Sequence, residues 1–144
     1  MMVAFNRHEG ISWNAEDGEA PLRHLITDDN LGFVVVLGAP GATVAGYAVV
    51  TFGYDLEFGG RDAFLTEFFL LDKVRGQGLG RHALKLVLDE VQARGGRALH
   101  LQVRAENIAA QRLYLDAGFA PTTRIFLSRL LYGEDESSAA LPNS

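Results

Sequence analysis

The chain has 144 residues, 48% of them hydrophobic and 22% charged, which suits one domain able to bury a core of its own. It has no cysteine, and this excludes disulfides, thiolate metal ligands and a cysteine nucleophile. The formal net charge is -5 and the sequence shows no basic patch, so we expect no binding to nucleic acid.

The sequence shows no membrane-span pattern and no signal-peptide pattern at residues 1–8. No apolar run reaches the roughly 18 residues of a membrane span, and residues 1–8 do not resemble a signal peptide. We therefore expect a cytoplasmic protein that does not associate with membranes. Residues 133–144 are small and polar and predict a flexible tail, so the single folded domain is expected over residues 1–132.

The first elements in chain order are predicted to be short helices. Residues 2–9 have the pattern of the end of a helix. Residues 20–27 predict a second, shortened helix that opens with Pro21, because proline is favoured in a first helical turn. No strand is expected before residue 32.

Three strand candidates follow. Residues 32–37 are an apolar run, residues 38–41 have the composition of a turn, and residues 44–52 are the expected hairpin partner. After a connection at residues 54–61, residues 64–71 are rich in aromatic and branched side chains and predict a buried strand.

A glycine-rich segment, residues 74–81, joins this buried strand to a helix. The helix is predicted because apolar residues recur every four positions, and it should end at the glycine pair 95–96. Glycines before a helix let the chain turn sharply and let a bulky anion approach the backbone amides at the positive end of the helix dipole. The segment therefore predicts a diphosphate-binding turn.

The spacing of this turn excludes two common phosphate motifs. A P-loop requires a lysine followed by serine or threonine, and neither is present. The dinucleotide motif requires a third glycine where Arg81 stands. What remains is the pattern Arg75-x-x-Gly78-x-Gly80.

The last elements complete an α/β protein with a mixed sheet. Residues 99–103 predict a strand, residues 108–117 a short helix, and a final strand should follow. The expected order is strand, strand, strand, helix, strand, helix, strand.

Two blocks resemble the GNAT superfamily of acyl-CoA-dependent N-acyltransferases: the pattern Arg75-x-x-Gly78-x-Gly80, and residues 110–119 with Tyr114 followed by a Gly-Phe pair. The likeness covers roughly residues 32–131. It implies a GNAT-type fold with a shortened N-terminus that lacks the first strand. Either the start is truncated, or the sheet edge is open or completed by a partner chain. The family commonly dimerises, so the resemblance also implies a homodimer.

The resemblance further implies which residues bind acetyl-CoA as cosubstrate. The amides of the glycine turn would hold its pyrophosphate, and the strand from Phe68 would diverge from the strand at residues 99–103, leaving amides free for pantetheine. Arg75 would contact phosphate or brace the turn, the side chains of Arg81 and His82 would assist or remain solvated, and Asn107 would cap its helix and could also contact pantetheine. The implied set is Phe68, Phe69, Leu70, Arg75, Gly76, Gln77, Gly78, Leu79, Gly80, Arg81, Asn107 and Tyr114.

Two residues are candidates for proton transfer. Glu67 is the only carboxylate in an otherwise apolar strand, where burial would raise its pKa toward the range of a general base. The alternative is that Glu67 pairs with Arg104 or another cation. Tyr114 matches the position at which the family places the acid that protonates the departing thiolate, and the alternative is a core tyrosine. The histidines show no metal-ligand spacing, so no metal is expected.

The expected function is transfer of an acetyl group from acetyl-CoA to a primary amine of a small molecule, in a ternary complex. Likeness to the spermidine/spermine type in residues 51–55 and 67–69 favours diamines, polyamines or lysine-like amines. Two alternatives stay open: a non-catalytic acyl-CoA-binding module, and a protein or peptide acetyltransferase.

Overall fold

The computed structural model describes residues 15–38 and 43–131. The chain forms two compact units, residues 25–120 and residues 1–24 with 121–144, and each is described by itself. The predicted helix end at residues 2–9, most of the turn at residues 38–41 and the predicted tail at residues 133–144 lie outside the described residues.

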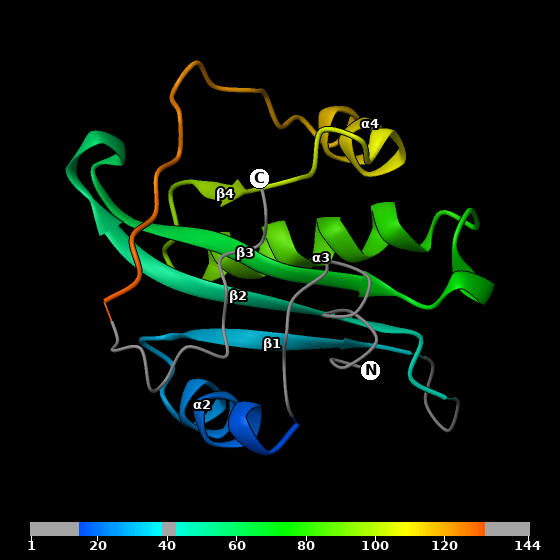
Figure 1. Cartoon of the computed structure of the whole chain (residues 1–144), viewed down its shortest axis with the longest axis horizontal. Coiled ribbons are helices and arrows are strands. Elements are labelled where there is room, and N and C mark those ends of the chain that lie inside the picture. Colours follow the sequence, from blue (N-terminus) through cyan, green and yellow to red (C-terminus); the bar gives the residue numbers. More distant parts are fainter. Residues whose placement is uncertain (1–14, 39–42, 132–144) are drawn as a thin grey trace. The chain divides into compact units, whose positions relative to one another are not determined.

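Residues 25–120 are built on a mixed sheet with the strand order β1-β2-β3-β4 (Figure 1). The strands are β1 (Gly32–Leu37), β2 (Gly46–Asp55), β3 (Gly60–Leu70) and β4 (Leu99–Leu101). β1, β2 and β3 are antiparallel neighbours, whereas β4 runs parallel to β3. The parallel pair requires a crossover, which α3 (Leu79–Ala93) supplies. The α/β mixed-sheet class predicted from the sequence is therefore confirmed.

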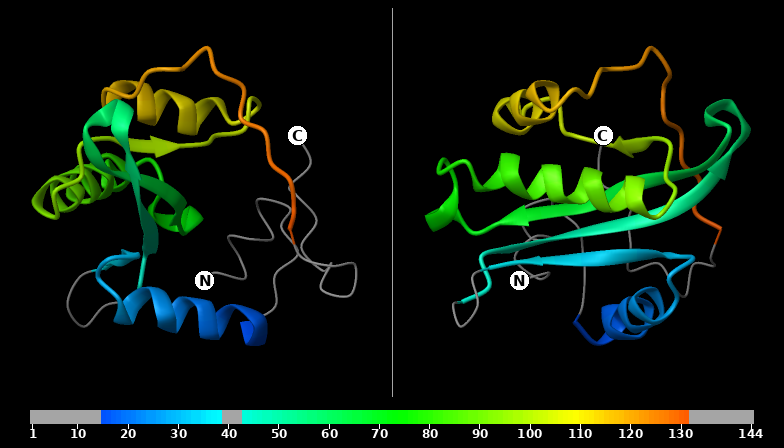
Figure 2. Two further views of the ribbon diagram at one scale, coloured as in Figure 1. Left: turned by 90° about the vertical axis from the view of Figure 1, so that its left-hand side faces the viewer. Right: turned by 180° about the vertical axis from the view of Figure 1, so that it is seen from behind.

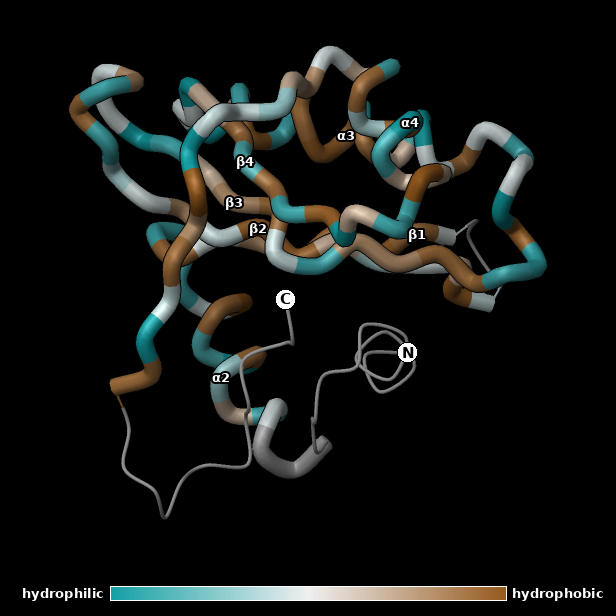
Figure 3. The backbone as a smooth tube through the Cα atoms, turned by 45° about the horizontal axis from the view of Figure 1, so that its top comes forward, coloured by the Kyte–Doolittle hydropathy of each residue, from teal (hydrophilic) through white to brown (hydrophobic). Residues whose placement is uncertain are grey.

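Helix α3 lies along one face of the sheet (Figure 2) and forms the core with it. Its buried residues are Ala83, Leu84, Val87 and Val91, the same stripe that the sequence predicts. They pack on side chains of the first three strands, which carry long apolar stretches (Figure 3): Phe33, Ala48, Val50, Ala63 and Leu65. The helix ends before Gly95, which has a φ of 84° that glycine adopts without strain, as expected.

A β-bulge in β3 changes which residues share a face of the sheet. Val50 pairs with Leu65 and Val49 pairs with Glu67, so Thr66 is the extra residue. Leu65 lies on the α3 face with Val50. Without the extra residue, side chains two apart would share a face and Glu67 would join Leu65. With it, Glu67 lies on the opposite face, beside Val49.

Short elements complete the described chain. Two 3₁₀ turns, η1 (Leu56–Phe58) and η2 (Asp72–Val74), flank β3, and α4 (Ile108–Asp116) follows β4. α2 (Ala15–Thr27) precedes β1. None of the helices among these residues is both long enough and apolar enough to cross a membrane.

Two sequence predictions are wrong in detail. α2 begins at Ala15 and not at residue 20, so Pro21 lies inside the helix. The five residues before Ala20 include Glu16, Asp17 and Glu19, and acidic residues favour the start of a helix. Residues 120–131 contain no strand, although a final strand was expected there. Apolar side chains such as Ile125 and Leu127 are exposed in this segment instead of paired in a sheet.

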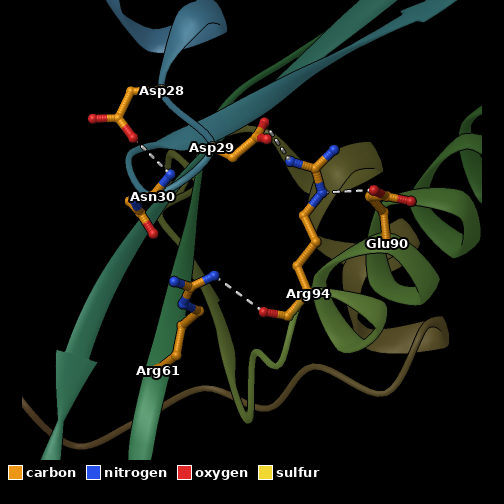
Figure 4. A network of polar contacts seen from close by, with 6 residues as sticks. All are labelled: Asp28, Asp29, Asn30, Arg61, Glu90 and Arg94. Carbon is orange, nitrogen blue, oxygen red and sulfur yellow. Dashed lines mark hydrogen bonds and ion pairs between the residues drawn. The ribbon is translucent and has the colours of Figure 1, made fainter.

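Arg94, the residue after α3, links the end of this helix to the loop before β1 through ion pairs (Figure 4). Its guanidinium forms ion pairs with Asp29 (3.6 Å) and Glu90 (2.6 Å). The same guanidinium lies 4.6 Å from the centre of the Phe33 ring. Its backbone carbonyl accepts a hydrogen bond of 3.1 Å from Arg61. One residue thus joins α3, the loop before β1 and strand β3.

We expect Arg94→Ala to lower the free energy of unfolding by about 1–2 kcal/mol, because it removes a cation–π contact and two ion pairs together. Chemical denaturation of the two proteins measures the difference. Lys85→Ala is the control, since it removes only the exposed pair of Lys85 with Asp89 and should change the value by less than about 0.5 kcal/mol. Equal effects of the two substitutions would contradict the role of Arg94.

Candidate active site

β3 and β4 stay paired over only three residue pairs. The last of these pairs is Leu65 with Leu101, immediately before the bulge at Thr66. From Glu67 to Leu70, β3 pairs with β2 but not with β4. The divergence predicted for Phe68, Phe69 and Leu70 is therefore present, and this edge of β3 can offer backbone groups to a ligand.

The glycine turn leads from this edge into α3. Gly76 and Gly78 both have a φ of 77°, and a Cβ atom at either position would meet no atom within 4 Å. Gly78 is the N-cap and makes no side-chain cap hydrogen bond. The first amides of α3, at Leu79, Gly80 and Arg81, have no acceptor within the helix by the geometry of an α-helix. The turn thus combines open space, amide donors and the positive end of a helix dipole.

Side chains of the turn mainly brace it. Arg75 donates a hydrogen bond of 3.0 Å to the Leu70 carbonyl and pairs with Asp72 at 3.0 Å. Gln77 donates to the Lys73 carbonyl at 3.3 Å. These contacts brace the turn, one of the two alternatives for Arg75, while a contact of Arg75 with phosphate stays a prediction.

The side chains that follow the turn are exposed. Arg81 makes an ion pair of 3.6 Å with Asp116 at the end of α4, and His82 lies on the exposed side of α3.

Gly80 packs closely: a Cβ there would lie 3.3 Å from Leu70 and 3.4 Å from Leu113. Gly80 thus sets the close approach of α3 to β3 and α4.

Glu67 lies beside Tyr47 of β2. The Tyr47 hydroxyl donates a hydrogen bond of 2.7 Å to Glu67 Oε2. Burial raises the pKa of Glu67, and this hydrogen bond, which favours the charged carboxylate, lowers it only in part. Burial and the neighbouring carboxylate raise the pKa of Tyr47. Arg104, the partner considered from the sequence, forms its ion pair with Glu106 at 3.6 Å.

Tyr114 lies on α4, against the face of β3 that carries Phe68. The ring centres of Tyr114 and Phe68 are 6.4 Å apart, and Phe119 lies 5.8 Å from Tyr114 on another side. Asn107 caps α4, because its side chain accepts a hydrogen bond of 3.1 Å from the Ala110 amide. The capping half of the expectation for Asn107 is therefore confirmed.

These positions place the two proton-transfer candidates on opposite faces of one strand. Glu67 lies on the face away from α3, and Phe68, its neighbour, contacts Tyr114 on the α3 side. The unpaired edge of β3 runs between them. Among the described residues, no three His, Asp or Glu side chains are grouped so that they could hold a metal ion.

Tyr47 was not singled out from the sequence. It falls within an expected strand, but only the bulge at Thr66 puts it on the same face as Glu67. No turn residue or break in alternation announces that bulge. The signal available in the sequence was a tyrosine within the predicted strand 44–52, since the next predicted strand, residues 64–71, carries Glu67.

The comparisons with known proteins agree with this arrangement. The model of the Acetyltransferase (GNAT) family matches residues 2–119, and the chain belongs to this family. Among solved structures, an integron cassette protein from the mobile metagenome of Cole Harbour Salt Marsh superimposes with a TM-score of 0.80 at 28% identity, covering 92% of this chain and 81% of that one.

Two curated relatives act on different amines. The chain is 28% identical over 125 residues to aminoglycoside N(6')-acetyltransferase type 1 of Serratia marcescens, a match that covers 85% of each protein. It is 49% identical over 47 residues to the ribosomal protein bS18-alanine N-acetyltransferase of Escherichia coli strain K12. This second match spans 33% of this chain and 32% of the relative.

Glu67→Gln should make the protein relatively more stable as the pH rises. The folded wild type holds the Glu67 proton more tightly than the unfolded chain, so the stability gained from it is present below the ordinary pKa of 4.5 and is lost as the pH rises through the raised pKa. Glutamine has no such loss. Chemical denaturation from about pH 4.5 to about pH 8 measures the difference, which grows by up to about 1.4 kcal/mol for each unit of raised pKa. A difference that is constant or shrinks with pH would contradict the burial of this carboxylate.

Proposed function

We propose that the protein is an N-acetyltransferase that moves an acetyl group directly from acetyl-CoA to a primary amine of a small molecule. The observation that carries this proposal is the placement of Glu67 and Tyr114 on the two faces of β3, at the edge where β4 diverges. Membership of the GNAT acetyltransferase family supports it.

The residues present fit acetyl-CoA. The turn at Gly76 and Gly78 has open space where side chains would stand, and the first amides of α3 point out of the helix end. Backbone groups of Phe68, Phe69 and Leu70 line the diverging edge. The turn would hold the pyrophosphate and the edge the pantetheine arm, and the bound molecule supplies the thioester.

The chain's own residues would move the protons. Alkylamines have pKa values near about 10, so the nucleophile must lose a proton on binding or attack. Glu67, whose pKa is raised by burial, accepts the ammonium proton and leaves a neutral amine as the nucleophile. As the nitrogen–carbon bond forms and the carbon–sulfur bond breaks, the nitrogen releases its second proton to solvent. Tyr114 donates a proton to the thiolate that leaves. Free amides of the diverging β3 edge would stabilise charge on the thioester carbonyl oxygen.

A small-molecule acceptor is favoured by the aminoglycoside acetyltransferase relative, which the chain matches along most of its length. The spermidine/spermine-like residues 51–55 and 67–69 favour diamines, polyamines or lysine-like amines within that class. One observation favours a second candidate: the short match at 49% identity to a ribosomal-protein-alanine acetyltransferase supports a protein N-terminus as acceptor.

The first test separates cofactor binding from backbone strain. Gly78→Ala and Gly95→Ala both place a side chain at a φ near 80° in open space, at the two ends of α3, so each costs about 1 kcal/mol of stability. We expect only Gly78→Ala to weaken coenzyme A binding, by about tenfold or more, as measured by calorimetry. Equal affinities of the two variants would contradict a pyrophosphate site at this turn.

The second test measures acetyl transfer. Release of the coenzyme A thiol is followed with aminoglycosides, diamines, polyamines, lysine analogues and a peptide with N-terminal alanine. We expect amine-dependent release that falls about 100-fold or more in Glu67→Gln and about 10- to 100-fold in Tyr114→Phe.

The acceptor panel also decides between the alternatives. Release with the alanine peptide alone would favour the second candidate. Coenzyme A binding without release from any amine would leave a non-catalytic binding module and overturn the proposal.

A further inference from the structure

Tyr47 and Glu67 are diagonal neighbours on one face of the sheet. Tyr47 pairs with Phe69 and Val49 pairs with Glu67, so the two side chains lie two residues apart on adjacent strands. At that spacing long side chains reach each other. A hydrogen bond of 2.7 Å from the Tyr47 hydroxyl to Glu67 Oε2 joins the two side chains.

Packing fixes the tyrosine that makes this bond. Tyr47 is only 5% exposed, and its ring centre lies 6.0 Å from that of Phe69 at a tilt of 41°. The Arg75 guanidinium lies 5.8 Å from the centre of the same Phe69 ring. A buried ring held in this way presents its hydroxyl in one place, whereas a glutamate side chain alone has several rotamers.

We infer that Tyr47 is a positioning residue for the catalytic carboxylate: it holds Glu67 Oε2 and leaves Oε1 as the oxygen that takes the proton from the amine. This inference rests on the proposed role of Glu67 as the base.

Few other charged groups share that face within residues 25–120. β1 contributes Val34 and Val36, which pair with Val49 and Tyr47. Beyond one end of β3, Arg75 lies near this face because its guanidinium contacts the Phe69 ring. Toward the other end of β3, Asp62 lies on this face and pairs with His100 at 3.3 Å. Among the described residues, Tyr47 is the neighbour that hydrogen-bonds Glu67, so its hydroxyl opposes part of the rise in pKa that burial causes.

Tyr47→Phe tests the inference because it keeps the ring and removes only the hydroxyl. Loss of a hydrogen bond to the charged form disfavours the carboxylate, so the acid limb of the kcat/KM profile should move to higher pH. At the acid end we expect a loss of about three- to tenfold, with KM for acetyl-CoA unchanged. Tyr54→Phe is the matched control: Tyr54 lies on the same strand, is 77% exposed, and its substitution should leave the profile in place.

A double-mutant cycle separates this role from a general effect on the fold. If Tyr47 acts through Glu67, Tyr47→Phe should have no further effect on kcat in the Glu67→Gln background. An equal loss in both backgrounds would overturn the inference, because the hydroxyl would then act without the carboxylate.

A measurement without turnover keeps the inference apart from the proposed function. The carboxyl carbon of Glu67, identified by its absence in Glu67→Gln, is titrated by NMR in the wild type and in Tyr47→Phe. A midpoint that moves to higher pH supports the inference, and an unchanged midpoint overturns it. Full activity of Glu67→Gln would instead remove the base from the proposed function, whatever the titration shows.

Discussion

At Thr66, strand β3 carries one residue more than its partner β2, and the alternation of the two faces is reset there. Leu65 before the bulge enters the core with α3, while Glu67 after it lies on the other face beside Tyr47. Pairing with β4 ends at the same point. The core, the buried carboxylate and the free strand edge therefore all depend on this one irregularity of the ladder.

The site joins two kinds of polar environment. At the glycine turn, backbone amides and a helix dipole favour negative charge and no side chain is required to supply it. At Glu67, burial disfavours negative charge and raises the pKa, whereas the hydrogen bond from the Tyr47 hydroxyl lowers the pKa in part. The Phe69 ring lies between them, since it contacts Arg75 of the turn and Tyr47, the hydrogen-bond partner of Glu67. In the proposed reaction, anion binding and proton acceptance would depend on one short stretch of β3.

Most of the fold was predictable from local patterns. Apolar periodicity identified α3, and the glycines at 76, 78 and 95 predicted its two ends. The relation between Glu67 and Tyr47 was not predictable, because a bulge shifts the face without a sequence signal. The missing final strand shows a similar limit, since residues 124–131 are mostly apolar but form no strand. The homodimer, the cytoplasmic location, the domain limits 1–132 and the small-amine acceptor stay predictions.

The uneven connectivity of the sheet has a consequence for folding order. β1, β2 and β3 follow one another through short connections, so their pairing closes small loops. β4 reaches β3 only after the whole of α3 and then pairs over three residues, so this contact has a high loop-closure cost and little ladder to offset it. We therefore expect the β3–β4 pairing to form late during folding and to open early during unfolding. A molecule that binds only when both strands are in place would stabilise the late-formed part of the sheet by mass action.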